Sequence, residues 1–156
     1  MGLCAVLLTS SPSVAAEIAP TKFVTTNGIT VLILEQHFLP IIEIHALIKT
    51  GSAQDPPDKA GLANLVASLL DEGTTTRTSK QLAEQIDFVG GSLEATASED
   101  FTTVSARVLK KDIDLGFTLL ADMLQHPAFQ KQEFERIRTQ LLGEMQATTT
   151  TQAISP

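Results

Sequence analysis

The chain has 156 residues, of which 43% are hydrophobic and 19% are charged, and its formal net charge is −7. This length and balance suit one globular domain or part of a larger one. The negative charge argues against a nucleic-acid partner, because no basic stripe is present to neutralise phosphates. The single cysteine, Cys4, excludes a disulfide within the chain and a zinc site built from cysteines.

The N-terminal residues 1–16 are similar to a shortened secretory signal. Leu3 to Leu8 form a short apolar segment, and small residues precede a candidate cleavage point before Glu17. The basic segment that normally comes first is missing, so a true start upstream, a late start codon and a merely unstructured apolar end all stay open. We expect export to a bacterial periplasm. No apolar run is long enough to span a membrane as a helix.

Strand patterns dominate the chain up to residue 52. The segment 22–36 predicts a β-hairpin, because Asn27-Gly28 is typical of a two-residue type I′ turn, in which both residues need a positive φ. A third strand is expected over residues 41–52, where apolar and polar residues alternate. Its apolar face carries Ile42, Ile44, Ala46 and Ile48.

Two helices are predicted between residues 61 and 91. The first, residues 62–70, is apolar nearly all round, which is typical of a buried helix. Its main apolar stripe comprises Leu62, Leu65, Val66 and Leu69. The second helix begins after Thr78, which forms a capping box with Gln81, and ends at Gly90-Gly91. Its apolar stripe comprises Leu82, Ile86 and Val89.

The remaining elements repeat the order of paired strands and paired helices. Strands are expected over 92–98 and 101–108, joined by a tight turn, and the register of the second stays open because its alternation is imperfect. A helix capped by Asp112 and a last helix over 132–146 follow, and residues 148–156 form a polar tail or linker. The apolar stripes of these helices are Ile113, Phe117, Leu120 and Leu124, and then Phe134, Ile137, Leu141 and Met145.

This order predicts an α+β fold, with a mostly antiparallel sheet and helix pairs packed on one face. The residues by themselves do not indicate a catalytic site. A catalytic zinc needs three protein ligands, and no two of His37, His45 and His126 are four residues apart, as an HExxH or HxxEH motif requires.

Five segments, in the same order, resemble the N-terminal part of the M16 family, the insulinase, pitrilysin and mitochondrial processing peptidase group. They are NGITVLILEQ, IHALIKTGSAQDPPDKAGLANLVASLLDEGT, QLAEQIDFVGGSLEATASEDFTTVSARVLKKDID, LLADMLQHPAF and FERIRTQLLGEMQ. The resemblance implies that residues 17–147 form the N-terminal portion of an M16-like peptidase domain, with the metallohydrolase fold of that family.

In active members of the family, the helix corresponding to residues 61–74 carries HxxEH, in which two histidines bind zinc and the glutamate acts on the attacking water. The resemblance places Asn64, Ala67 and Ser68 at these positions. It places Glu144 at the third zinc ligand and Glu99 at a supporting acidic position. Amide and hydroxyl oxygens are poor zinc ligands, and alanine cannot accept a proton. We therefore expect no catalytic residue and no zinc site, with both glutamates as relics.

The family works in two-part assemblies, in which some zinc-bearing subunits pair with a partner that lacks the motif. The resemblance thus implies an inactive subunit that assists peptide binding beside an active, zinc-bearing M16 partner, with zinc in that partner only. Two alternatives stay open. One is a zinc metalloendopeptidase, which would need ligands that the sequence does not display. The other is a purely structural subunit, like the family's core subunits in respiratory complexes.

Overall fold

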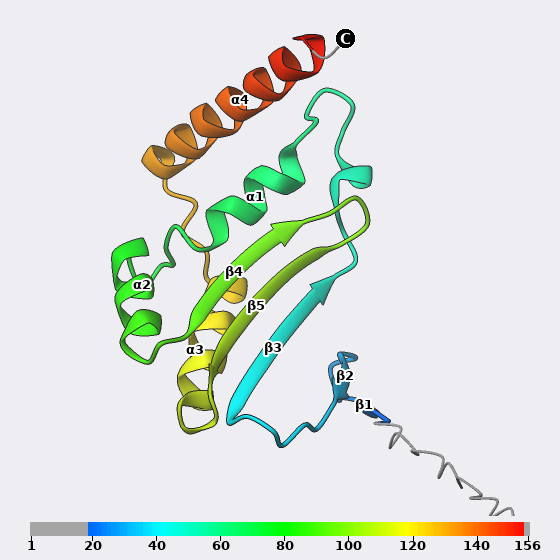
Figure 1. Cartoon of the computed structure of the whole chain (residues 1–156), viewed down its shortest axis with the longest axis vertical. Helices are drawn as coiled ribbons and strands as arrows, with labels where there is room; N and C mark the ends of the chain where they lie inside the picture. Colours follow the sequence, from blue (N-terminus) through cyan, green and yellow to red (C-terminus); the bar gives the residue numbers. More distant parts are fainter. Residues whose placement is uncertain (1–18, 155–156) are drawn as a thin grey trace, which may run out of the picture. The chain divides into compact units, whose positions relative to one another are not determined.

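A computed structural model describes the backbone of residues 19–154 and the side chains up to residue 143 (Figure 1). The candidate signal, residues 1–16, lies outside the described residues. The elements are β1 (Thr21–Val24), β2 (Thr30–Ile33), β3 (Ile41–Ile48), α1 (Leu62–Leu70), α2 (Ser79–Phe88), β4 (Ser92–Ala97), β5 (Thr102–Leu109), α3 (Ile113–Gln125) and α4 (Lys131–Ile154). This is the predicted order. No helix among the described residues is long and apolar enough to cross a membrane.

The chain divides into two compact units between Leu39 and Pro40. In the first, β1 and β2 form the predicted antiparallel hairpin, but the predicted turn is wrong. The amide of Gly28 donates to the carbonyl of Thr25 (3.0 Å), and of the two turn residues only Gly28 has a positive φ, 88°. This is a three-residue loop with a glycine bulge. The Thr25 hydroxyl donates to the carbonyl of Ile29 and accepts from its amide, and these two hydrogen bonds close the loop between Thr25 and Ile29.

The second unit is built on a three-stranded antiparallel sheet with the order β3-β5-β4. Its register places Ala46 of β3 and Ala95 of β4 on either side of Val104. In β5, whose register the sequence left open, buried and more exposed residues alternate from Thr102 onward. Phe101 lies before the strand, with 37% of its surface exposed. The helix-facing side of the sheet carries Ile42, Ile44, Ala46, Leu93, Ala95, Val104, Ala106 and Val108.

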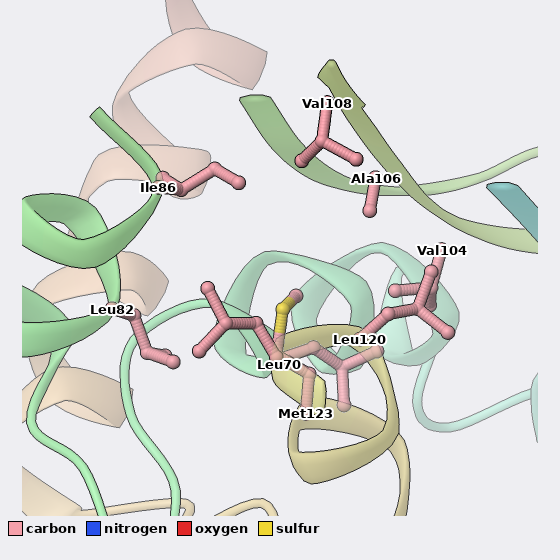
Figure 2. Close-up of a cluster of buried hydrophobic side chains, with 9 residues drawn as sticks. Leu70, Leu82, Ile86, Val104, Ala106, Val108, Leu120 and Met123 are labelled. Carbon is pink, nitrogen blue, oxygen red and sulfur yellow. The ribbon is translucent and has the colours of Figure 1, made fainter. Parts of the chain in front are cut away.

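The core lies between this sheet face and the helices (Figure 2). Val104, Leu119 and Met123 are fully buried, and Leu82 and Ile86 of α2 close one side, as their stripe predicted. The capping box is also confirmed, since the amide of Gln81 donates to the Thr78 hydroxyl (3.2 Å) and the Gln81 side chain accepts from the Thr78 amide (2.9 Å). Helices therefore cover the sheet face that the alternation predicted.

Two predicted apolar stripes are rotated in the structure. In α3, Phe117 is 52% exposed, and the buried set is Gly116, Leu119, Leu120, Asp122 and Met123. The reason is a close approach at Gly116, where an added Cβ would lie 3.0 Å from Val108. In α1, Leu62 and Val66 are 39% and 38% exposed, so this helix is buried only toward its end, through Ala67, Leu69 and Leu70.

The last helix is longer than the sequence predicted. α4 begins at Lys131 and continues to Ile154, past the expected end at Gln146. Ile137 is buried, and Phe134 and Leu141 are half-buried, in agreement with the predicted stripe. Over residues 131–143, the part of α4 whose side chains are described, the apolar seam is therefore narrow.

Candidate functional site

The start of α1 is built by a loop that reaches back to the sheet. A Cβ at Gly51 would overlap the carbonyl oxygens of Ser98 and Glu99, so only glycine allows this approach. The amides of Ser52 and Ala53 donate to those same carbonyl oxygens, each at 2.9 Å. Glu99, a predicted supporting acid, thus contributes its backbone here, while the residue itself is exposed in the turn.

Asp55 caps α1 from outside the helix. Its carboxylate accepts hydrogen bonds from the amides of Gly61 (2.9 Å) and Ala63 (3.0 Å), two donors that a helix start leaves unpaired. Gly61 itself has a φ of 90°, which glycine adopts without strain. The sequence analysis did not single out Asp55, because a cap several residues ahead of its helix leaves no regular spacing.

The three positions assigned to the zinc motif have different surroundings. Asn64 is exposed and Ser68 is half-buried, whereas Ala67 is only 2% exposed and packs into the protein. Asn64 and Ser68 are four residues apart and therefore share one helix face. Ser68 lines an open hollow of about 240 Å³ between α1, β4 and α4, here called the α1–α4 hollow. Its other lining residues are Asp71, Glu72, Ala95, Arg136, Ile137, Gln140 and Leu141.

Charged side chains from both helices meet in the α1–α4 hollow. Arg136 of α4 contacts Glu72, just after α1, with Nη2 2.5 Å from Oε1, and contacts Glu133 with Nε 2.8 Å from Oε2. The hydrogen bonds to Glu72 and Glu133 raise the pKa of Arg136. Burial raises the pKa of Asp71, which lines the same hollow. The hollow is thus polar, and its cation is already engaged by carboxylates.

The side chains on this face of α1 do not fit a zinc ion. Asn64 and Ser68 offer neutral oxygens, and Ala67 offers no donor atom. Nowhere among the described residues do three histidine, cysteine, aspartate or glutamate side chains gather as a metal site would require. Glu144, the predicted relic ligand, lies within the backbone of α4, but its side chain lies outside the described part of the chain.

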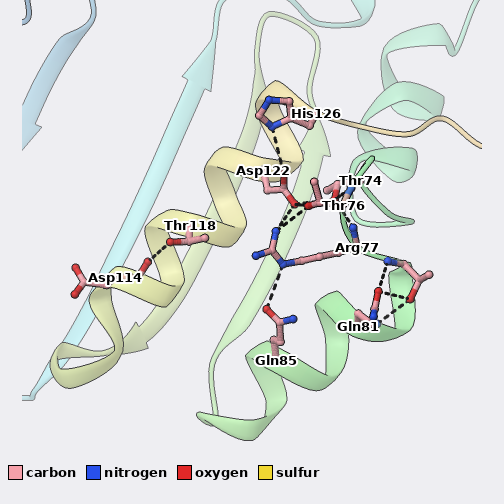
Figure 3. A network of polar contacts seen from close by, with 10 residues as sticks. Thr74, Thr76, Arg77, Gln81, Gln85, Asp114, Thr118, Asp122 and His126 are labelled. Atoms are coloured by element: carbon pink, nitrogen blue, oxygen red, sulfur yellow. Dashed lines mark hydrogen bonds and ion pairs between the residues drawn. The ribbon is translucent and has the colours of Figure 1, made fainter.

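A second polar cluster lies where the loop after α1 meets α3 (Figure 3). Oδ2 of Asp122 accepts hydrogen bonds from Thr74 (2.7 Å), Thr76 (2.8 Å) and Arg77 (2.6 Å). Its other oxygen is 3.3 Å from Nδ1 of His126. These five residues form what we call the Asp122 cluster. Backbone bonds join the same segments, including one from the Thr75 amide to the His126 carbonyl (2.8 Å).

The Asp122 carboxylate is held in its charged form. Burial by itself would raise its pKa, but the hydrogen bonds from Thr74, Thr76 and Arg77, together with the charge of Arg77, outweigh burial and lower the pKa to about 2. The cluster therefore ties the loop after α1 to the end of α3. The sequence analysis missed Asp122, although a carboxylate between Ala121 and Met123 in an apolar helix was a visible signal.

Comparison with known sequences gives matches over most of the chain. A profile of the family described as "Insulinase (Peptidase family M16)" matches residues 30–154. A protein of Rickettsia felis named "Uncharacterized zinc protease" is 32% identical over 119 residues, which are 76% of this chain and 29% of that protein. The probable mitochondrial-processing peptidase subunit beta of Arabidopsis thaliana is 33% identical over 130 residues, 82% of this chain and 24% of that protein.

A relative with a different name also matches. The Helicobacter pylori protein named "Non-peptidase homolog YmxG" is 28% identical over 117 residues, 75% of this chain and 27% of that protein. Among solved structures, the peptidase M16 inactive domain from Pseudomonas fluorescens superposes with a TM-score of 0.78 at 24% identity, covering 83% of this chain and 32% of that one. The fold is therefore similar, and this chain spans less than a third of the length of each of these proteins.

Proposed function

This chain belongs to the insulinase family of peptidases, M16, and we propose that it is a catalytically inactive subunit of that family, which assists peptide binding beside an active, zinc-bearing partner. The observation that carries this proposal is the composition of the α1 face, where Asn64, Ala67 and Ser68 occupy the positions that the family resemblance assigns to HxxEH. Without two imidazoles and a general base, zinc-dependent hydrolysis has neither its metal nor its proton acceptor.

The surroundings of Ala67 support the same proposal. This residue is 2% exposed, so it leaves no open space at the position from which a glutamate would act on water. The Helicobacter pylori relative that bears the name of a non-peptidase homolog supports inactivity as well.

Peptide binding is proposed through the sheet. Among the described strands, β4 is an edge strand of the β3-β5-β4 sheet, and α1 runs beside it (Figure 1). An extended peptide can add to such an edge through main-chain hydrogen bonds with little demand on its sequence. A peptide bound there would pass along the α1–α4 hollow, whose wall includes Ala95 of β4.

The experiment combines metal analysis with reconstitution. The purified full-length protein is analysed for zinc and assayed with an unstructured peptide, first by itself and then mixed with an M16 subunit of the same organism that carries an intact HxxEH. We expect no stoichiometric zinc, no cleavage by the chain by itself, and cleavage by the pair with a lower KM than the active subunit shows without it. Stoichiometric zinc with chelator-sensitive cleavage by the chain itself would overturn the proposal.

A second candidate is a zinc metallopeptidase, favoured by the Rickettsia felis relative that is named a zinc protease at 32% identity. It would need metal ligands from outside the face of α1. A purely structural subunit is the third. The same experiment separates them, because a structural subunit would join an M16 partner without changing its KM and without binding peptide.

Export to the periplasm is part of the proposal and rests on residues 1–16, which precede the described chain. Cell fractionation with intact-mass measurement tests it. We expect a periplasmic protein whose N-terminus is Glu17, and a cytoplasmic protein with an intact N-terminus would contradict export.

A further inference from the structure

The seam between α4 and α1 is thinly packed. Among the described elements, α4 packs mainly against α1. Only Ile137 of its described apolar residues is buried, while Phe134 and Leu141 are half-buried. The α1–α4 hollow lies along the same seam, so side chains do not fill it. Over residues 131–143, whose side chains are described, apolar burial along this contact is therefore small, and a polar contact can add to it.

Arg136 supplies that interaction. It is the residue before Ile137, and its guanidinium contacts one carboxylate on each side of the seam, Glu72 after α1 and Glu133 on α4. Glu72 has 19% of its side chain exposed and Arg136 has 49%, so water screens the arginine end of this short contact and the carboxylate end only partly. The planar fork of arginine suits such a double contact, whereas lysine offers one compact charge.

We propose that this guanidinium bridge, Glu72–Arg136–Glu133, does in this chain what a shared zinc ion would do in a subunit with an intact motif, namely hold α4 against α1. The inference rests on the proposed function, because it assumes that no zinc joins the two helices. A metal ion coordinated by side chains of two helices holds those helices together, and the loss of its ligands removes that link. Here a fixed cation on α4 meets a carboxylate next to α1 beside Ser68, the position assigned to the second histidine.

Hydrogen exchange of the full-length protein tests the bridge. Arg136→Met keeps the aliphatic stem and removes the charge. We expect the amides of residues 131–143 to exchange about tenfold faster, as the loss of the one charge-assisted contact that crosses the seam implies, while those of β5 and α3 stay unchanged. Arg136→Lys should give an intermediate rate, because it keeps the charge but not the fork.

The matched control is Arg138→Met on the same helix, since the ion pair that Arg138 makes among the described side chains is with Glu135 of α4, at 3.4 Å. A second pair of variants separates the two carboxylates. Glu72→Gln should reproduce the effect of Arg136→Met, and Glu133→Gln should have a smaller effect. Equal exchange in Arg136→Met and Arg138→Met, or equal effects of the two glutamate variants, would overturn the bridge.

Addition of a chelator to the unaltered protein distinguishes the two proposals. If α4 is insensitive to chelator and also to Arg136→Met, the bridge fails while the zinc-free subunit survives. If chelator removes stoichiometric zinc and releases α4, both fail. If chelator has no effect and Arg136→Met releases α4, both hold.

Discussion

One polar group of side chains joins the loop after α1 to α3 and another lines the α1–α4 hollow, and the two groups differ in how their charges are satisfied. In the Asp122 cluster, one carboxylate that is 9% exposed accepts three side-chain hydrogen bonds and also faces His126. In the α1–α4 hollow, the wall is open, Ser68 is half-buried, and the carboxylates of Glu72 and Glu133 share the guanidinium of Arg136. The first group holds segments of the fold together, and the second lies where the family resemblance places the chemistry.

The difference shows that the contacts which stabilise the fold do not depend on the side chains at the positions assigned to the zinc motif. Buried polar groups need hydrogen-bond partners, so the loss of the Asp122 carboxylate removes an acceptor from several donors at once. Asn64 and Ser68 are more exposed, so changes there leave the packing of α1 intact. A chain can therefore keep the fold while the zinc positions carry other residues.

The largest expected effect is at the centre of the closed cluster. Asp122→Ala removes the carboxylate that accepts from the hydroxyl of buried Thr74 and from Nη1 of Arg77, and we expect a loss of about 3 kcal/mol in the free energy of unfolding. Urea unfolding followed by circular dichroism measures it. Asp114→Ala is the control, because Asp114 is exposed in the first turn of the same helix and should cost less than about 1 kcal/mol. Equal losses would show that the cluster is not special.

Periodicity predicted the fold well because alternation and helical stripes report which face is buried. The order of elements and the buried face of the sheet followed from it, and the capping box at Thr78 followed from the local Thr78–Gln81 motif. It failed where contact between elements decides. Phe117 turns outward because Val108 packs on Gly116, and the side-chain bonds of Thr25 set the hairpin loop. Neither contact has a sequence period.

The candidate site was less accessible to sequence reasoning. Asn64, Ala67 and Ser68 were located through resemblance, since nothing in their own chemistry marks a site. Asp55 and Asp122 act over separations of several to many residues, so their partners appear only in three dimensions. The structure also shows that Ala67 is buried and Asn64 is not, a distinction that the apolar run of α1 conceals.

That distinction gives the second prediction, which sharpens the contrast between packed and open positions. Ala67→Glu inserts a long carboxylate where the side chain is 2% exposed, and we expect a loss of about 2 kcal/mol from overpacking and charge burial. Asn64→Glu on the same helix should cost less than about 1 kcal/mol, because Asn64 is exposed. Urea unfolding again measures both. If Asn64→Glu cost as much as Ala67→Glu, the face of α1 that carries Asn64 would not be open.

The third prediction concerns acid. The pKa of Asp122 is lowered from 3.8 to about 2 in the folded protein, so the unfolded chain takes up the proton first. The stabilisation by this carboxylate is therefore complete above about pH 4 and is lost as the pH falls from there toward 2. The free energy of unfolding, measured from pH 6 to pH 2, should fall less steeply in that window for Asp122→Asn, because the amide at position 122 does not take up a proton. An identical slope in both proteins would contradict the lowered pKa.

The smallest expected effect restores donors to the open face. Asn64→His with Ser68→His places two imidazoles four residues apart on one side of α1, a spacing that lets both bind one metal ion. Zinc at about five times its dissociation constant should then raise the free energy of unfolding by about 1 kcal/mol, and the unaltered protein should not respond. The matched control is Lys80→His with Glu84→His on α2, an exposed pair with the same spacing. The α1 pair should bind zinc more tightly, because the carboxylates of Asp71 and Glu72 line the same hollow as residue 68. Equal zinc affinity of the two pairs would mean that the carboxylates of the α1–α4 hollow do not contribute to zinc binding by the histidines on α1.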